Sequence, residues 1–584
     1  MSALRFAIAS LVLVAAITSL SVSAQTQVLN PCIAALASVS AAVRPARTVQ
    51  ELKYGRFGND DRDVRDLLHF SNTARARVKT EAVTPAADRD ENNIAILDDT
   101  GDLIIAPNLF DLANRGLRFV PATASYAVSS IGGEFRSTLG RALTLGDDDS
   151  TAQTIAFPFD FYGRRFTSLF VNSDGNLTFE EPDSASTARG AVRLSAGAPR
   201  IAPFFTDLDP SAGGRVFVDS TAEAMSVTWC AVPAFDSPLT MTVQATLFPG
   251  GVIEYRFGAP TLVDGLVGLS PGHTESFFSV DLTEMAAPQR EPVAFAETFS
   301  SSFSLDLVAA TRRFYATHPD NFDQLVFWTE APVLTDAFAF QSGVKNTVTG
   351  TGLDIEDFAA ELGSAGALQS VVNMDRIAKY GDSPSAKVFG ENSALGILAH
   401  ETGHRWLTRI QFIDHNRQMS DALLGRQRAH WSFFADTDGS VMEGNEIQDL
   451  GGGSFRTGPI TEKYSRLDLY AMGLATAAEV PSWFYVESPL GSHDREEGTT
   501  ANITFNGTRR NVLIQDVIDA LGPRVPAAAS SSRLHRQAYI FVRRRSAFQN
   551  PQDLTRLSRI RQDFGPFFSR ATEGRMTLRT TLSP

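Results

Sequence analysis

From about residue 120 to residue 288, the sequence is a series of short runs of alternating apolar and polar residues, separated by Gly, Asp and Pro. The clearest unit has two such runs, 166–171 and 176–179, joined by the residues Asn-Ser-Asp-Gly at 172–175. An Asp-Gly pair between strand-like runs is a strong signal for a β-hairpin. Regular strand spacing without helical periodicity predicts an antiparallel β-sandwich-like domain. Because 584 residues are too many for one core, we expect further domains around it.

Three segments of this stretch carry longer motifs. Residues 157–163 read Phe-Pro-Phe-Asp-Phe-Tyr-Gly, residues 171–179 read Val-Asn-Ser-Asp-Gly-Asn-Leu-Thr-Phe, and residues 200–210 read Arg-Ile-Ala-Pro-Phe-Phe-Thr-Asp-Leu-Asp-Pro. With these motifs the stretch resembles the extracellular nidogen-like domain. The resemblance implies an adhesion-type module that binds an extracellular surface or matrix ligand, and not an active site.

Two acidic stretches raise the question of calcium. In the β domain the acids are Asp147, Asp148, Asp149, Asp207 and Asp209, and further along the chain residues 436–439 read Asp-Thr-Asp-Gly. Neither stretch completes a calcium loop with its full set of oxygen ligands. We therefore interpret these acids first as solvated turn residues, with Ca²⁺ as the alternative.

The N-terminus has the pattern of a secretory signal. Arg5 precedes an apolar run from Phe6 to about Ile17, and Val22-Ser23-Ala24 places small residues where a signal peptidase cleaves. We predict a signal peptide at 1–24 and a secreted or periplasmic protein. Residues 25–119 form an N-terminal extension, which we interpret as a packing segment, with an inhibitory pro-segment as the alternative.

Composition restricts the partners of the chain. The formal net charge is −14, and an acidic chain repels nucleic-acid phosphates, so we expect no nucleic-acid partner. No segment after the signal reaches about 18 uninterrupted apolar residues, so we predict no membrane span. The only two cysteines, Cys32 and Cys230, could form a disulfide in an oxidising compartment, although their spacing does not decide it.

From about residue 289 to the end, helical and strand patterns mix, which predicts an α+β domain of nearly 300 residues. Within it the sequence 392–406 predicts a helix that contains His400-Glu401-Thr402-Gly403-His404. Residues four apart lie on the same face of a helix, so the two imidazoles can bind one Zn²⁺. Histidine is scarce, 9 of 584 residues, so a chance match to this motif has odds on the order of one per cent.

Glu401 has a different role in this pattern. It lies about 100° round the helix from His400, where its carboxylate can reach an activated water and not the metal. A carboxylate in that place serves as general base. The sequence therefore predicts His400 and His404 as zinc ligands and Glu401 as the catalytic base.

A catalytic zinc usually has a third protein ligand. We favour Asp468, because an acid between Leu467 and Leu469 in an apolar run needs a partner if it is buried. The alternatives are Glu446, Glu443 and His430. Tyr464, Tyr470 or His430 could donate to an oxyanion, although a core or surface role is the simpler interpretation for each.

Four segments between about 300 and 580 carry a second resemblance: residues 400–406 around the histidine pair, 430–432 (His-Trp-Ser), 440–445 (Ser-Val-Met-Glu-Gly-Asn) and 464–473 around Asp468. Together they resemble an exported bacterial zincin-type metallopeptidase family, which implies peptide-bond hydrolysis. The aspzincin pattern is similar to 468–473 in residue types but differs in spacing. The subclass therefore stays open.

These observations predict a multidomain chain: a signal peptide (1–24), an extension (25–119), a nidogen-like β-sandwich domain (120–288) and a zincin-type α+β domain (289–584). The predicted function is a secreted zinc metalloendopeptidase that hydrolyses extracellular proteins. The alternative is an extracellular adhesion protein with a structural or inactive zinc site.

Overall fold

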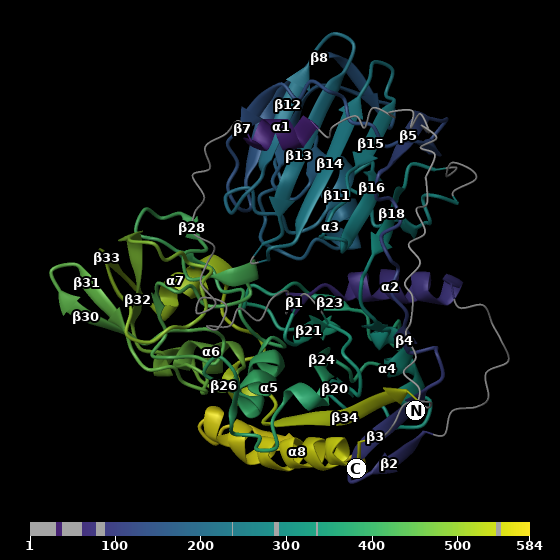
Figure 1. Cartoon of the computed structure of the whole chain (residues 1–584). Helices are drawn as coiled ribbons and strands as arrows, with labels where there is room; N and C mark the ends of the chain where they lie inside the picture. Colours follow the sequence, from purple (N-terminus) through teal and green to yellow (C-terminus); the bar gives the residue numbers. More distant parts are fainter. Residues whose placement is uncertain are drawn as a thin grey trace, which may run out of the picture.

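The computed structural model describes residues 31–37, 61–77, 88–235, 237–284, 291–334, 337–544 and 550–583. The predicted signal peptide lies outside these residues. The structure has two parts, a β domain at the top of Figure 1 and a mixed sheet with helices below it. Among the described residues, no helix is both long enough and apolar enough to cross a lipid bilayer.

The β domain consists of two seven-stranded sheets, and strands in both sheets contribute to one apolar core. All strand pairs but one are antiparallel, the exception being β17–β18. In sheet order, the first sheet contains β17 (Phe277–Ser279), β18 (Ala294–Phe299), β16 (Gly265–Ser270), β11 (Arg200–Phe205), β10 (Asn176–Thr178), β9 (Arg164–Asn172) and β8 (Ser150–Phe161). The second contains β6 (Tyr126–Gly132), β5 (Arg115–Pro121), β15 (Ile253–Phe257), β14 (Thr240–Leu247), β13 (Met225–Pro233), β12 (Arg215–Ser220) and β7 (Arg141–Leu143). The predicted β-rich domain is therefore present.

The hairpin expected at the Asp-Gly pair is also present. Strands β9 and β10 are antiparallel, with Asn172 opposite Asn176. Gly175 in the turn has φ +66°, and a Cβ there would collide with the carbonyl oxygen of Phe204. Glycine meets both requirements, because it adopts positive φ without strain and leaves room for the neighbouring backbone.

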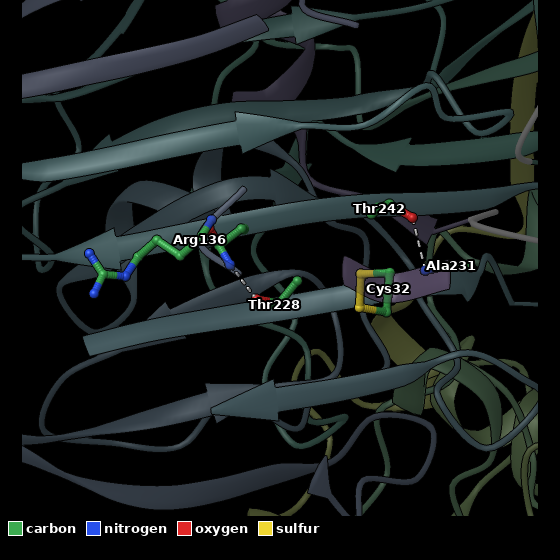
Figure 2. Close-up of a disulfide and its surroundings, with 7 residues drawn as sticks. Cys32, Arg136, Thr228, Ala231 and Thr242 are labelled. Carbon is green, nitrogen blue, oxygen red and sulfur yellow. Dashed lines mark hydrogen bonds between the residues drawn. A yellow bond between two sulfur atoms is a disulfide. The ribbon is translucent and has the colours of Figure 1, made fainter. Parts of the chain in front are cut away.

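Cys32 and Cys230 form the disulfide that the sequence left undecided, with Cα atoms 5.4 Å apart (Figure 2). It joins α1 (Pro31–Ala37) to strand β13 of the β domain. Nearby, Ala231 N donates to Thr242 Oγ1 at 2.9 Å, which ties β13 to β14 beside the disulfide.

The second part is built on a mixed sheet. Its strands, in sheet order, are β1 (Asp61–Arg62), β21 (Phe340–Gly343), β24 (Ser370–Arg376), β20 (Gln324–Thr329), β34 (Leu534–Arg544), β3 (Ile94–Asp99) and β2 (Arg89–Glu91), with β35 (Thr577–Arg579) beside β34. The core on one face includes α5 (Ala394–Gly403) and α8 (Pro551–Ala571). The core on the other face includes α2 (Val64–Arg77) and α4 (Leu307–Tyr315). The sheet thus lies between two helical layers.

A smaller five-stranded sheet lies beside this body, over a separate aromatic cluster. Its strands, in sheet order, are β29 (Ala435–Asp436), β32 (Trp483–Leu490), β33 (Thr504–Val512), β31 (Ser454–Thr457) and β30 (Ile447–Gly451). Helices α6 (Arg466–Ala471) and α7 (Ile514–Leu521) belong to the same half of the chain.

The N-terminal segment does not form a separate extension. Strand β3 pairs in parallel with β34, and all six of its residues are buried. The two apolar runs on either side of residues 99–101 do not form a hairpin with each other, because the second run, β4 (Ile104–Ile105), pairs instead with β19 (Ser304–Leu305). The Asp99 carboxylate redirects the chain between the two runs by accepting from the backbone N–H groups of residues 101–104.

The β domain is consequently an insertion. The chain leaves the mixed sheet through β4 and returns through β19, and these two strands are antiparallel neighbours. A bridge between Asn108 and Ser300 continues the pairing toward the β domain. Boundaries drawn along the sequence at 119 and 288 miss this arrangement, because it depends on pairing between strands more than 400 residues apart.

This architecture makes a prediction about stability. Ile96 is fully buried in the same core as Trp328, so Ile96→Ala should lower the free energy of unfolding of the C-terminal body by about 2–5 kcal/mol. Guanidinium unfolding of a Trp229→Phe background isolates this effect, because the remaining tryptophans lie outside the β domain. Glu91→Ala, at an exposed position on β2, is the matched control and should change stability little. Equal stability of both variants would show that the segment folds apart from the sheet.

Candidate metal centre

Helix α5 places the motif histidines. Ser393 caps the helix by accepting from Gly396 N at 3.0 Å, and all ten helical residues are buried. Gly403, near the end of the helix, allows close packing, because a Cβ there would come within 3.0 Å of the Tyr464 ring and closer still to Met442. The predicted helix is therefore present and held rigidly inside the core.

Three histidines converge at this helix. The Nε2 atoms of His400 and His404 lie 3.1 Å apart, and His430 Nε2 lies 3.2 Å from His400 Nε2. His430 follows the short 3₁₀ turn Arg426–Arg428 and reaches the pair from a different part of the chain. His400 and His430 are fully buried, and His404 is 3% exposed.

The backbone fixes which ring nitrogen carries the proton. Each Nδ1 faces a backbone carbonyl: Val441 O at 2.8 Å for His400, Leu407 O at 3.2 Å for His404 and Arg426 O at 2.7 Å for His430. A carbonyl only accepts, so each Nδ1 donates and each neutral ring keeps a lone pair on Nε2. The three Nε2 lone pairs converge, and the lone pair of His430 accepts from Arg426 Nη2 at 2.9 Å in this structure, so a metal held there would replace that hydrogen bond. This arrangement is stabilised by a cation, and it is the usual way in which proteins orient histidine ligands.

The spacing fits zinc. Ligand nitrogens at about 2.0–2.1 Å from a tetrahedral zinc lie about 3.3 Å from one another. The two measured Nε2 separations are close to that value. Three imidazoles with one open position are also a donor set found at catalytic zinc. His400, His404 and His430 are therefore the residues that would hold the metal.

Asp468, the sequence's first choice for the third ligand, does not belong to this cluster. It is fully buried, and its Oδ2 accepts from Ser440 Oγ at 2.6 Å and from Ser465 N at 2.7 Å. Its Oδ1 accepts from Trp431 Nε1 at 2.9 Å. Desolvation raises the pKa of this carboxyl despite these bonds. The partners that this buried acid needs are thus the capping groups of α6 and Trp431. His430 replaces Asp468 as the candidate for the third metal ligand.

The other candidates have separate positions. Glu443 pairs with Arg426 at 2.9 Å, and Glu446 is outside the three-histidine cluster. Tyr464 donates its hydroxyl to Ala399 O at 2.6 Å within α5. The Tyr470 hydroxyl accepts from Arg524 N at 3.1 Å. Both tyrosines therefore support the scaffold around the histidines.

Two charged groups next to the centre matter for its chemistry. Glu401 is fully buried on α5. Burial lowers the pKa of Lys379 to about 8 and raises the pKa of Tyr380, and nearby Glu401 has a smaller raising effect on both. Arg426 Nη2 lies 2.9 Å from His430 Nε2 and is held by Glu443. Arg426 could not be predicted from the sequence, since no local spacing links it to the motif.

The acids of the β domain form a second cluster. Carboxylate oxygens of Asp147, Asp148 and Asp207 lie within 4.8 Å of one another. Arg189 already provides positive charge there, at 2.5 Å from Asp148 and 2.9 Å from Asp207. Burial and the neighbouring acids raise the pKa of Asp147 to about 9. Asp149 and Asp209 accept backbone N–H groups in turns, as does Asp436 of the second acidic stretch.

Comparison with known proteins concerns the β domain. A family described as NIDO related matches residues 125–315, which supports the nidogen-like domain. The match ends before His400, Glu401 and His404. No curated protein matches the chain, and no solved structure matches it.

The geometry of the centre distinguishes two third-ligand candidates. We expect His430→Gln to weaken zinc binding by at least about 100-fold, since it removes one of three converging nitrogens. Asp468→Asn should retain zinc and lower the free energy of unfolding by about 1–3 kcal/mol, because its buried hydrogen bonds are disturbed. Zinc content after dialysis against a competing chelator, beside a thermal melt, measures both. Loss of zinc in Asp468→Asn with retention in His430→Gln would reverse the assignment.

Proposed function

We propose that the chain is a secreted zinc-dependent endopeptidase that hydrolyses peptide bonds in extracellular proteins. The observation that carries the proposal is the convergence of three Nε2 atoms, each with its Nδ1 bound to a backbone carbonyl. Glu401, a residue type that a purely structural zinc site does not need, lies next to His400 on the same buried helix.

The mechanism assigns each group one task. His400, His404 and His430 would hold Zn²⁺, which when bound would lower the pKa of water to about 7 and polarise a carbonyl. Glu401 accepts the proton of the attacking water and returns it to the leaving amine. The Arg426 guanidinium adds positive charge where the carbonyl oxygen becomes negative. Burial of α5 excludes bulk water and strengthens these interactions.

The inserted β domain suggests how the enzyme would meet its substrates. A nidogen-like module is of the adhesion type, and it would hold the enzyme at an extracellular surface or matrix ligand. The net charge of −14 disfavours nucleic acid as a partner. The disulfide between Cys32 and Cys230 suits an exported protein, either secreted or periplasmic.

A second candidate function follows from the same domain. The NIDO-related match favours an adhesion or matrix-binding protein in which the zinc site is structural or inactive. The two functions differ in what they require of Glu401, because structural zinc needs only the three histidines.

Glu401→Gln tests the choice. We expect this variant to bind about one zinc per chain and to lose about 10²- to 10⁴-fold in turnover of a quenched protein substrate, since it removes the general base. Removal of zinc by a chelator should abolish the wild-type activity as well. Glu361→Gln, at an exposed site, is the control and should cleave normally. Normal turnover by Glu401→Gln would refute the mechanism, and zinc without cleavage in the wild type would favour adhesion.

A further inference from the structure

A cavity of about 400 Å³ lies where three parts of the chain meet. One wall comes from the segment that contains β1 and the start of α2, and another from the β-domain segment that leads into α3 (Ala191–Ala196). The third wall belongs to the mixed-sheet body and includes His404 and Arg405. A metal-ligand candidate and its neighbour in sequence therefore both line this cavity.

Arg405 is unusual among the buried arginines. It is 6% exposed, its Nε donates to Gln369 Oε1 at 2.7 Å, and its Nη1 donates to Asn346 Oδ1 at 3.4 Å. Both acceptors are neutral amide oxygens. Among the described residues, Arg405 makes no contact with a carboxylate, and its Nη2 has no protein acceptor.

The other buried arginines show what is usual in this chain. Four of them contact a carboxylate: Arg189 with Asp174, Arg200 with Asp183, Arg426 with Glu443 and Arg543 with Asp98. The fifth, Arg524, does not line the cavity and donates to two backbone carbonyls and to Ser531. Arg405 thus carries a buried charge, has few hydrogen-bond acceptors in the protein and lines a cavity.

The remaining cations of the cavity wall are engaged. Arg409 pairs with Asp61, Lys345 pairs with Asp357 at 2.7 Å, and Arg193 pairs with Asp183 at 2.8 Å. Arg62 lies over the Phe340 ring at 4.0 Å. An anion that enters the cavity therefore finds its best available donor at Arg405.

The charge of Arg405 persists at neutral pH. Burial lowers the pKa of its guanidinium to about 10, which is still well above 7. Asp323 and Glu356 favour the charge through space without contacting it. Burial also raises the pKa of Glu356 to about 7. The wall contains four further acids, Asp61, Asp63, Asp66 and Asp354. Asp61 pairs with Arg409, Asp63 pairs with Arg65, and Asp66 accepts from Val192 N. A buried cation without a contacting counter-ion is costly, and a carboxylate with bidentate geometry removes that cost.

We propose that Arg405 binds a carboxylate of the substrate in this cavity, so that the preferred substrates are peptides with an acidic group close to the scissile bond. The inference rests on the proposed function, because His404 links the cavity to the metal centre. The carboxylate could be an acidic side chain or the free C-terminus of a short peptide, and the two sources are separable by experiment.

The first experiment measures kcat/KM with the zinc-loaded mature chain. One series of quenched peptides carries Glu or Gln at each position on either side of the scissile bond, and a second ends in a free carboxylate or an amide. We expect a preference of about 10- to 100-fold for the charged member of one series, the range of a charge-assisted hydrogen bond. Preference in the first series identifies a side chain, and preference in the second identifies the C-terminus. Equal rates within both series overturn the inference without any variant.

The variants then assign the effect to Arg405. Arg405→Gln should bring the ratio of kcat/KM between the charged and the uncharged peptide to about 1, whatever its effect on the rate with both. Arg405→Lys should retain part of the preference, because lysine keeps the charge but lacks the two parallel N–H donors of a guanidinium. Arg409→Gln is the matched control, since it lines the same cavity but already pairs with Asp61, and it should keep the preference. A preference that survives in Arg405→Gln overturns the assignment.

A binding measurement separates this inference from the proposed function. Calorimetric titration of the mature chain with N-acetyl-glutamate amide and N-acetyl-glutamine amide, and with N-acetyl-glutamine as the free acid, requires no hydrolysis. One outcome is that the protein cleaves no peptide but binds a carboxylate probe, and that Arg405→Gln abolishes this binding. That outcome would support the anion site and refute the peptidase. The opposite outcome is that the protein cleaves peptides without a preference for a carboxylate and binds no carboxylate probe. That outcome would support the peptidase and refute the anion site.

Discussion

The parallel pairing of β3 with β34 is the contact on which the rest of the structure depends. It joins residues 94–99 to residues 539–544 and places both strands inside the mixed sheet. Once these distant segments are paired, the chain must leave the sheet after β3 and return to it before α4. The antiparallel pair of β4 with β19 provides that exit and return. The whole β domain can then fold as an inserted unit without interrupting the sheet.

The same sheet supports the cluster of three histidines. Helix α5 shares a core with the sheet residues Val326, Trp328 and Val372, which leaves the helix no freedom to rotate. His430 is brought to it by a network of its own: Trp431 donates to Asp468, and Asp468 caps α6. Asp468 thus acts on the site through its hold on the segment next to His430. Burial of an acid was a correct signal of a tight partner, although the partner is a hydrogen-bond network.

Sequence predicted those features that depend on local spacing. The i, i+4 histidines lie on one helix face because helix geometry alone dictates it, and the β domain follows from alternation and turn residues. His430 was named only as one alternative for the third ligand, because it lies 30 residues from His400 and reaches it through a turn fixed by carbonyl contacts. The pairing of β3 with β34 could not be predicted, since pairing over such a distance leaves no local pattern. The missing counter-ion of Arg405 is likewise a property of the folded cavity.

Because the β domain is inserted into the chain, it forms part of the cavity next to the three histidines. The three histidines are almost completely buried, and His404 is the one that also lines the cavity. Two of the cavity's walls come from parts of the chain far in sequence from α5. One is the segment 61–66, and the other is the β-domain segment 187–196. Asp66 connects these two walls, because its Oδ1 accepts from Val192 N at 2.8 Å. A group that approaches the three histidines through this cavity therefore contacts the inserted domain, so the β domain contributes to the shape of the approach.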